Sequence, residues 1–349
     1  MSTDHKICIF LSGALGDFVN ALPALSALRQ RYSASQIELV GNPSWLPLLE
    51  ESCLVDRVFS QEVLPLAAAF RRPLSCSNPL ERFLQPFDLV LSWFGDSEGL
   101  WERALKQLCP GSVHVFPLHR YRDHPGHVSQ YFLSTLRNLG IQAACTGPGR
   151  FPWKKPVDLE GEAPGGANSG DSPYVSIHPG SGSQKKNWMP ERFLEVSRSI
   201  REEWNLESRI LLGPAERGQK SFWEGIQMPG LIVLSDLSLV ALARLLSGTR
   251  LYLGNDSGVT HLASCVGAPV VALFGPTDPA RWGPTGESVS ILQGKTSCAP
   301  CGSSPQAECT SPDCLRVITT DQVLEAAERV LRIKHSARQI NRKASASDP

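Results

Sequence analysis

Short apolar runs alternate with amphipathic stretches along almost the whole chain, and this alternation constrains the fold more than any other feature. Runs such as residues 6–11, 174–178 and 269–274 have the length of buried strands. Helical periodicity fills the intervals between the runs, for example over residues 17–32 and 190–204. Strands that alternate with helices form parallel sheets covered by helices on both faces. The sequence therefore predicts an α/β protein with doubly wound sheets.

One segment interrupts the alternation. Residues 160–173, EGEAPGGANSGDSP, are rich in Gly, Pro, Ala and Ser, which is typical of a linker. A length of 349 residues also fits two domains better than one. We therefore expect an N-terminal domain over residues 1–160, a linker over 161–173 and a C-terminal domain over 174–335, with a disordered tail at 336–349. Two such halves imply a cleft in which ligands lie beyond the strand ends.

Charge and hydropathy disfavour two classes of function. Lys plus Arg and Asp plus Glu each number 34, so the formal net charge is zero, whereas nucleic-acid-binding proteins usually carry a basic excess. No apolar run approaches the roughly 18–20 residues that a membrane span needs. The apolar stretch at the N-terminus is soon followed by Asp17 and lacks a small-residue cleavage site, unlike a signal peptide. We expect a cytoplasmic protein that does not bind nucleic acid.

The first candidate motif is SGALGDF at residues 12–18, directly after the first predicted strand. Its glycines allow a tight turn, and Asp17 stands where a helix begins. The carboxylate either caps this helix or serves as a general base toward a hydroxyl, and the residues alone leave both roles open. It would also compete with a phosphate for the helix amides, so the turn suits a neutral ligand. A helix start should lower the pKa of Asp17, so a base role would require domain closure to exclude water.

The second motif, IHPGSGSQKKNWMPERF at residues 177–193, has the composition of a phosphate-binding loop. Small residues follow a strand end and let backbone amides approach an anion closely, while Lys185 and Lys186 add positive charge. The sequence G-K-S/T is missing, so this is not a Walker A loop. A solvated loop with two surface lysines is the alternative.

The third motif, residues 251–284, is the most specific. After a predicted strand, Asp256, Ser257 and Gly258 form a turn that begins a short helix carrying His261. The free amides at such a helix start favour a phosphate. Taken alone, His261 would more often be a packed core residue than a ligand contact.

Four of the ten cysteines cluster with the spacing C-x2-C-x7-C-x4-C: Cys298, Cys301, Cys309 and Cys314. The first pair has the spacing of zinc ligands, but the later separations are irregular for a structural zinc loop. A chain of this size without a secretion signal favours free thiols or a metal site over a disulfide framework. We expect reduced thiols or a disulfide formed on isolation, with structural zinc as the less favoured alternative.

Together the motifs resemble the bacterial lipopolysaccharide heptosyltransferases of glycosyltransferase family 9. The resemblance runs from ALGDFVNALPALSALR through HPGSGSQKKNW to GNDSGVTHLASCVGAPVVALFGPTDPARWGP and the cysteine loop. It implies the GT-B fold, with two Rossmann-like domains facing across a cleft, the acceptor on the first and the nucleotide sugar on the second. It also implies inverting transfer of heptose from ADP-heptose to the inner core of a lipid-linked oligosaccharide, without a divalent metal or other cofactor.

The resemblance also implies residue roles. Asp17 matches the catalytic base. Eight further residues match donor contacts. The phosphate loop is matched by Ser181, Gly182 and Lys186, and the contact to the ribose hydroxyls by Glu216. The turn that holds the pyrophosphate and the sugar is matched by Asp256, Ser257, Gly258 and His261. Residues 64–84 match nothing identifiable, which leaves the acceptor open. We expect a monomer that contacts the inner face of the cytoplasmic membrane only peripherally.

Other functions remain compatible with the sequence. An enzyme of the same family could use another nucleotide sugar or acceptor, and an epimerase of the same fold would convert the donor without any acceptor. A non-catalytic nucleotide-sugar-binding protein would bind without turnover, although intact Asp17, Lys186 and Asp256 argue against it. An NAD-linked dehydrogenase is disfavoured because no G-x-G-x-x-G follows a predicted strand.

Overall fold

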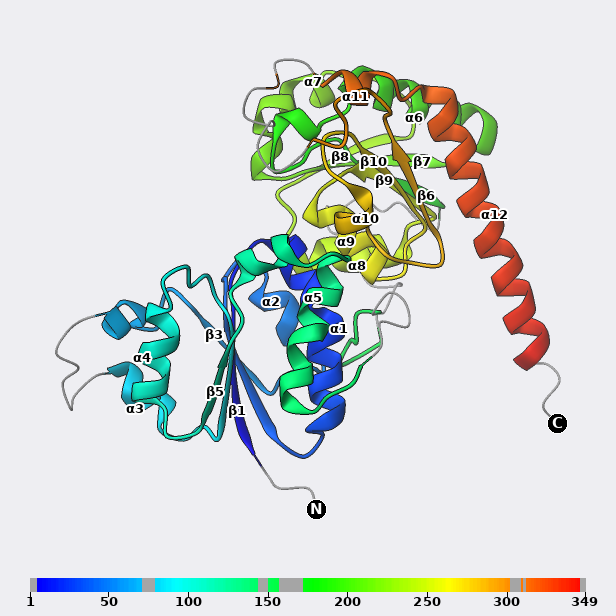
Figure 1. Cartoon of the computed structure of the whole chain (residues 1–349). Coiled ribbons are helices and arrows are strands. Elements are labelled where there is room, and N and C mark those ends of the chain that lie inside the picture. Colours follow the sequence, from blue (N-terminus) through cyan, green and yellow to red (C-terminus); the bar gives the residue numbers. More distant parts are fainter. Residues whose placement is uncertain are drawn as a thin grey trace. The chain divides into compact units, whose positions relative to one another are not determined.

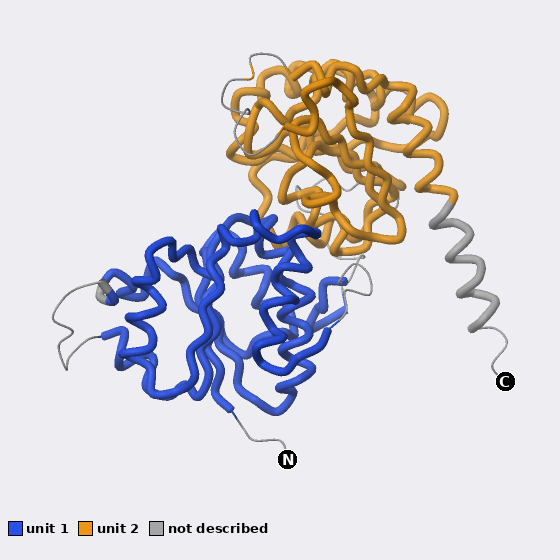
Figure 2. The backbone as a smooth tube through the Cα atoms, viewed as in Figure 1, with its two compact units in different colours: residues 1–156 blue, residues 157–349 orange. Residues whose placement is uncertain are grey.

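The structure is a computed structural model, and it describes residues 5–70, 79–143, 150–156, 172–301, 309 and 312–345. The chain divides into two compact units, residues 1–156 and 157–349, called unit 1 and unit 2 below (Figure 2). Most of the predicted linker lies outside the described residues. Among the described residues, no helix has both the length and the apolar character needed to cross a membrane.

Unit 1 is built on a five-stranded parallel sheet with the order β3-β2-β1-β4-β5. Helices α1 and α5 lie on one face, and α3 and α4 on the other (Figure 1). The strands are β1 (Lys6–Leu11), β2 (Gln36–Gly41), β3 (Arg57–Ser60), β4 (Leu89–Trp93) and β5 (Ser112–Val115). The helices are α1 (Leu15–Arg31), α2 (Leu46–Glu50), η1 (Leu66–Phe70), α3 (Pro79–Leu84), α4 (Leu100–Leu108), η2 (Leu118–Asp123), α5 (Val128–Thr135) and η3 (Leu136–Leu139).

Unit 2 has a six-stranded parallel sheet with the order β11-β10-β9-β6-β7-β8. Its strands are β6 (Tyr174–His178), β7 (Glu207–Leu212), β8 (Leu231–Ser235), β9 (Leu251–Asn255), β10 (Val270–Phe274) and β11 (Val289–Gln293). Its helices are η4 (Gln184–Lys186), α6 (Pro190–Trp204), η5 (Pro214–Gln219), α7 (Lys220–Glu224), α8 (Leu239–Gly248), α9 (Gly258–Cys265), α10 (Pro279–Trp282), α11 (Asp313–Arg316) and α12 (Thr320–Ser345). Both sheets confirm the predicted α/β class with doubly wound parallel sheets.

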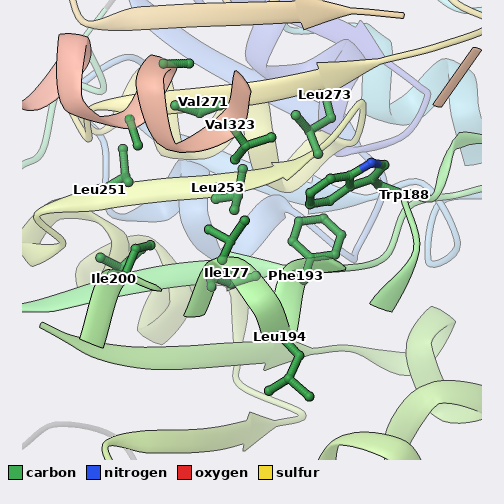
Figure 3. Packing of buried hydrophobic residues seen from close by; sticks show 14 of the residues in the cluster. Ile177, Trp188, Phe193, Leu194, Ile200, Leu251, Leu253, Val271, Leu273 and Val323 are labelled. Carbon is green, nitrogen blue, oxygen red and sulfur yellow. The ribbon is translucent and has the colours of Figure 1, made fainter. Parts of the chain in front are cut away.

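The core of unit 2 contains strand residues packed against helices α6 and α12 (Figure 3). Ile177, Leu253 and Leu273 come from the neighbouring strands β6, β9 and β10, and all three are fully or almost fully buried. Strands covered on both faces read as continuous apolar runs, which is why these segments were recognisable in the sequence. The Trp188 and Phe193 rings meet edge to face, with centroids 5.0 Å apart. Trp188 anchors the loop after β6 in this core, because its Nε1 donates a hydrogen bond to the Ile318 carbonyl at 3.1 Å.

Both sheets reverse their winding direction once. In unit 1, β2 and β3 lie on one side of β1, and β4 is added on its other side. In unit 2, β7 and β8 lie on one side of β6, and β9 is added on its other side. Loops that leave two such neighbouring strands run to opposite faces, which leaves a crevice beyond the carboxyl ends. Each of the three sequence motifs lies at such a strand end, after β1, β6 and β9 respectively.

Helix α12 corrects one prediction. The sequence predicted a helix ending near Ile333 and a disordered tail from Ser336, but the helix continues to Ser345. Lys, Arg, Gln and Ala have high intrinsic helix propensity, and this stretch contains no Gly or Pro, so a polar sequence can continue a helix there.

Candidate functional site

Two loops of unit 2 come together at the switch point between β6 and β9. The Lys186 ammonium lies 2.8 Å from Asp256 Oδ2, and both side chains are largely buried. These residues are 70 positions apart in the chain, so the ion pair joins the second sequence motif to the third. The predicted phosphate loop and the predicted helix turn are therefore parts of one site.

Asn255, the last residue of β9, links the same two loops and was not singled out from the sequence. It is fully buried. Its Nδ2 donates a hydrogen bond to the Pro179 carbonyl at 2.9 Å, and its Oδ1 accepts one from the Trp188 amide at 3.0 Å. These two bonds tie the loop after β6 to the end of β9, so Asn255 has a structural role. The sequence signal that could have identified Asn255 is a polar residue at the end of an otherwise apolar strand.

Helix α9 begins at this site. Ser257 is its N-cap residue, and the Ser257 hydroxyl accepts a hydrogen bond from the Thr260 amide at 3.3 Å. The first amides of any helix have no partner within the helix, so those of Gly258 and Val259 are available to an anion. His261 lies in the first turns of α9 and is buried, as the packed-histidine alternative requires. Its role in donor binding stays a prediction.

The loop after β6 is closed by Ser181. The Ser181 hydroxyl lies 2.7 Å from the Ser183 carbonyl and 2.6 Å from Asn187 Oδ1, so it serves the loop itself. A Cβ added at Gly182 would meet no atom within 4 Å. Packing therefore does not require glycine at position 182, and the space beside its backbone is open. Backbone amides, more than the Ser181 hydroxyl, are the groups that this loop can offer to a ligand.

Gly180 of the same loop is required by packing, which the sequence did not reveal. A Cβ at this position would lie 1.9 Å from Glu216 Oε1. Glu216 is in η5, after β7, and only 3% of its surface is exposed. Its Oε2 accepts a hydrogen bond from the Gly213 amide at 2.8 Å and lies 3.6 Å from His178 Nε2. Burial alone would raise the pKa of Glu216, but the contacts with His178 and Gly213 outweigh burial and lower this pKa.

Asp17 of unit 1 lies in the first turn of α1, at the helix start where the sequence placed it. Ala14 is the N-cap residue of α1, and Asp17 stands three residues later, where its Oδ2 accepts a hydrogen bond from the Ala14 amide at 2.9 Å. Asp17 thus stabilises the start of the helix as in a capping box. Among the described residues this is the one hydrogen bond recorded for the carboxylate, which leaves its second oxygen available.

The turn before Asp17 is rigidly held. Gly13 has a φ of +105°, and a Cβ there would lie 2.5 Å from Asp17 Oδ2, so glycine is required twice over. The Gly13 carbonyl accepts hydrogen bonds from Asn42 Nδ2 at 3.1 Å and Trp45 Nε1 at 3.2 Å. Trp45 in turn stacks on Phe18, with centroids 4.6 Å apart. Asn42 and Trp45 carried no signal in the sequence because their contacts are long-range.

The expected direction of the Asp17 pKa shift was wrong. Burial raises the pKa of Asp17, and the hydrogen bond from Ala14 lowers it by less. A lowered pKa was predicted from the helix start alone, without the desolvation that accompanies burial of the carboxylate. A carboxylate with a raised pKa is a stronger base. A role of Asp17 as general base therefore depends less on the exclusion of water by domain closure than the sequence suggested.

No disulfide joins Cys298, Cys301, Cys309 and Cys314 in the structure. Burial raises the pKa of Cys301 and Cys314, as do the neighbouring cysteines of the cluster. The described part of the chain, which includes all four cysteines, holds no group of three or more His, Cys, Asp or Glu side chains placed to bind a metal ion. Whether these thiols form a disulfide on isolation or bind zinc stays a prediction.

The chain is similar to known glycosyltransferases in both sequence and fold. Residues 148–310 match the family model of glycosyltransferase family 9 (heptosyltransferase). Lipopolysaccharide heptosyltransferase 1 of Pseudomonas aeruginosa is 26% identical over 327 residues, which cover 85% of this chain and 86% of that protein. A family 9 glycosyltransferase from Veillonella parvula superposes with a TM-score of 0.76 at 20% identity, covering 95% of this chain and 98% of that one.

The fold comparison extends to a second solved enzyme. Escherichia coli ADP-heptose lipopolysaccharide heptosyltransferase II superposes with a TM-score of 0.71 at 15% identity, covering 95% of this chain and 99% of that one. The two doubly wound units thus have the GT-B fold of these enzymes. The phosphate loop after β6 and the Asp256–Gly258 turn after β9 are joined in one site, and the family model spans both, so this part of the chain is similar to glycosyltransferase family 9, the heptosyltransferases.

Proposed function

We propose that this protein transfers heptose from ADP-heptose to a hydroxyl of the lipopolysaccharide inner core, with inversion at the anomeric carbon. The observation that carries the proposal is the Lys186–Asp256 ion pair beside the start of α9. It gathers a cation, free helix amides and a carboxylate at one switch point, which is what a sugar diphosphate requires. The names of the Pseudomonas and E. coli relatives support the choice of donor and acceptor.

Each group of the site has a distinct task in this proposal. The Lys186 ammonium and the amides of Gly258 and the open Gly182 loop bind the diphosphate. The Asp256 carboxylate holds Lys186 while the site is empty and then accepts hydrogen bonds from sugar hydroxyls. Glu216 accepts from the ribose hydroxyls, and His261 contacts the sugar. The charged groups that these tasks require, an ammonium for the diphosphate and carboxylates for the hydroxyls, are all present among the side chains of the site.

The reaction is an in-line displacement. The acceptor oxygen attacks the anomeric carbon from the face opposite ADP, the bond from that carbon to the diphosphate oxygen breaks, and Asp17 takes the acceptor proton. Negative charge grows on the leaving ADP, where Lys186 and the helix amides stabilise it, and each preorganised donor of this kind is worth about 3–4 kcal/mol. Base catalysis contributes about 10²- to 10⁴-fold. Attack from the opposite face gives inversion.

Two further features belong to the proposal. The cationic and dipolar groups named above take the role that a divalent ion has in other transferases, so transfer should proceed at full rate in EDTA. The protein should work as a monomer in the cytoplasm, and its lipid-linked acceptor should bring it to the inner face of the cytoplasmic membrane.

The test is a transfer assay with purified protein. ADP-heptose is incubated with lipopolysaccharide acceptor that lacks heptose, and ADP release and the mass of the acceptor are followed. Addition of one heptose with equimolar ADP supports the proposal. Conversion of the donor without acceptor would indicate an epimerase, and ADP binding without turnover would indicate a binding protein; either result would overturn it. A panel of other nucleotide sugars and acceptors then tests the specificity.

A further inference from the structure

His178 connects two parts of the donor site that were predicted separately. It is the last residue of β6, at the switch point, and is only 6% exposed. Its Nε2 lies 3.6 Å from Glu216 Oε2, and its Nδ1 lies 3.4 Å from the Ser257 hydroxyl. One imidazole ring therefore contacts both the element that follows β7 and the N-cap of α9.

The chemistry of the partners fixes the roles of the two ring nitrogens. A carboxylate only accepts hydrogen bonds, so the Nε2–H group of His178 is the one that can donate toward Glu216, while Nδ1 faces the Ser257 hydroxyl. The lone pairs of Ser257 then face the Thr260 amide, which that hydroxyl caps. His178 thereby sets the orientation of the helix cap as well as that of the carboxylate.

A buried polar network continues beyond Ser257. The Ser257 hydroxyl lies 3.1 Å from Thr260 Oγ1, which lies 3.0 Å from the Tyr252 hydroxyl. Gly254, opposite His178 in the sheet, leaves room for this network, because a Cβ there would be 2.4 Å from the Tyr252 hydroxyl. Burying a polar group costs free energy unless the group is hydrogen-bonded. If position 178 served packing alone, an apolar side chain would fill the space without this cost. The polar ring points to a role beyond packing.

We propose that His178 is a positioning residue for the donor, whose ring holds Glu216 and Ser257 at the separation that a ribose diphosphate requires. The proposal rests on the proposed function, since Glu216 is assigned to the ribose and the turn at Ser257 to the diphosphate. Both contacts are long for hydrogen bonds. Catalytic-site contacts of this length commonly tighten when the ligand binds.

Three substitutions separate the two contacts. His178→Asn keeps a polar atom near the position of Nδ1 and so keeps the Ser257 contact, whereas His178→Gln keeps one near Nε2 and the Glu216 contact. His178→Phe keeps the ring volume and loses both. The matched control is Tyr174→Phe at the opposite end of β6, where the lost hydroxyl donates to the Leu245 carbonyl at 2.7 Å.

The measurements are dissociation constants for ADP and for adenosine, with Tm as a check on folding. We expect about ten-fold weaker ADP binding in His178→Phe. His178→Asn should weaken ADP and adenosine alike, because the ribose contact is affected, whereas His178→Gln should weaken ADP and spare adenosine. The control variant should lower Tm and leave both constants unchanged.

Several outcomes would overturn the proposal. Wild-type affinity in His178→Phe would reduce His178 to a packing residue. If that variant fails to fold, the Asn and Gln variants decide instead. If both variants lose affinity for ADP and for adenosine to the same extent, His178 is again only a packing residue. Failure of the unaltered protein to bind ADP would instead refute the proposed function, and with it the role of His178.

Discussion

The ends of β1 and β6 occupy equivalent places in their sheets, yet they present opposite chemistry. After β1, the Asp17 carboxylate already accepts the Ala14 amide, so a negative group occupies the helix start. After β6 and β9, a lysine and the free amides of α9 lie together. The first turn repels anions and the second attracts them. The difference teaches that one topology can present two chemistries: in the proposed reaction, the turn of unit 1 suits an uncharged hydroxyl, and that of unit 2 suits a diphosphate.

The largest effect should come from Asp17→Asn. The amide oxygen can still accept from the Ala14 backbone, so the turn survives while the base is lost. We expect the transfer rate to fall about 10²- to 10⁴-fold, with the ADP dissociation constant unchanged in calorimetry. A variant that retains its transfer rate would remove Asp17 from the reaction, and one that loses ADP affinity would contradict the separation of the two turns.

Lys186→Ala tests the other side of the comparison. Loss of the ammonium removes a charged contact to the diphosphate and leaves Asp256 unpaired beside it, so ADP should bind about 10- to 100-fold more weakly. Lys220→Ala is the control, since Lys220 forms an exposed pair with Glu224 and its loss should change nothing. Equal ADP affinity in the two variants would exclude Lys186 from the phosphate site.

Two glycines of the unit 2 loop should behave differently. Gly180→Ala forces a methyl group against Glu216 and should destabilise the protein by about 1–3 kcal/mol, which denaturant unfolding measures. Gly182→Ala meets no protein atom, so its stability should not change, although ADP should bind more weakly where the new methyl meets the ligand. Identical unfolding curves for the two variants would show that the loop differs from the one described here.

The smallest effect concerns the raised pKa of Asp17. A carboxyl group whose pKa is higher in the folded than in the unfolded state stabilises the protein at low pH, and that contribution is lost as pH rises through the folded pKa. At neutral pH the charged, partly desolvated carboxylate therefore opposes folding. Asp17→Asn should raise Tm slightly at pH 7 and lose this advantage in acid. A lower Tm at pH 7 would contradict the direction of the shift.

The same pKa predicts the pH dependence of catalysis. Transfer requires an ionised Asp17, so the acid limb of kcat/KM should lie at higher pH than an ordinary aspartate would give. The Asp17→Asn variant, with its residual rate, provides the control and should lack this limb. An acid limb that persists unchanged in that variant would belong to another group.

Local sequence signals predicted the three turns and most of the strands and longer helices, because apolar periodicity and Gly-rich strand ends are properties of short segments. They missed the partly buried strands β3 and β11. The contacts that assemble the site were hidden. Asn255 and Pro179 are 76 positions apart, and Ser257 and His178 are 79 apart. No local pattern contains such pairs. The pKa of Asp17 was predicted with the wrong sign for a related reason, since burial depends on distant residues while the helix start is local.

A crystal structure of the protein with ADP tests the division between the two turns most directly. The account predicts that the diphosphate contacts the Lys186 ammonium and the first amides of α9, and that Lys186 has turned from Asp256 toward it. A diphosphate bound at the Asp17 turn, or a Lys186–Asp256 pair left intact beside bound ADP, would contradict it.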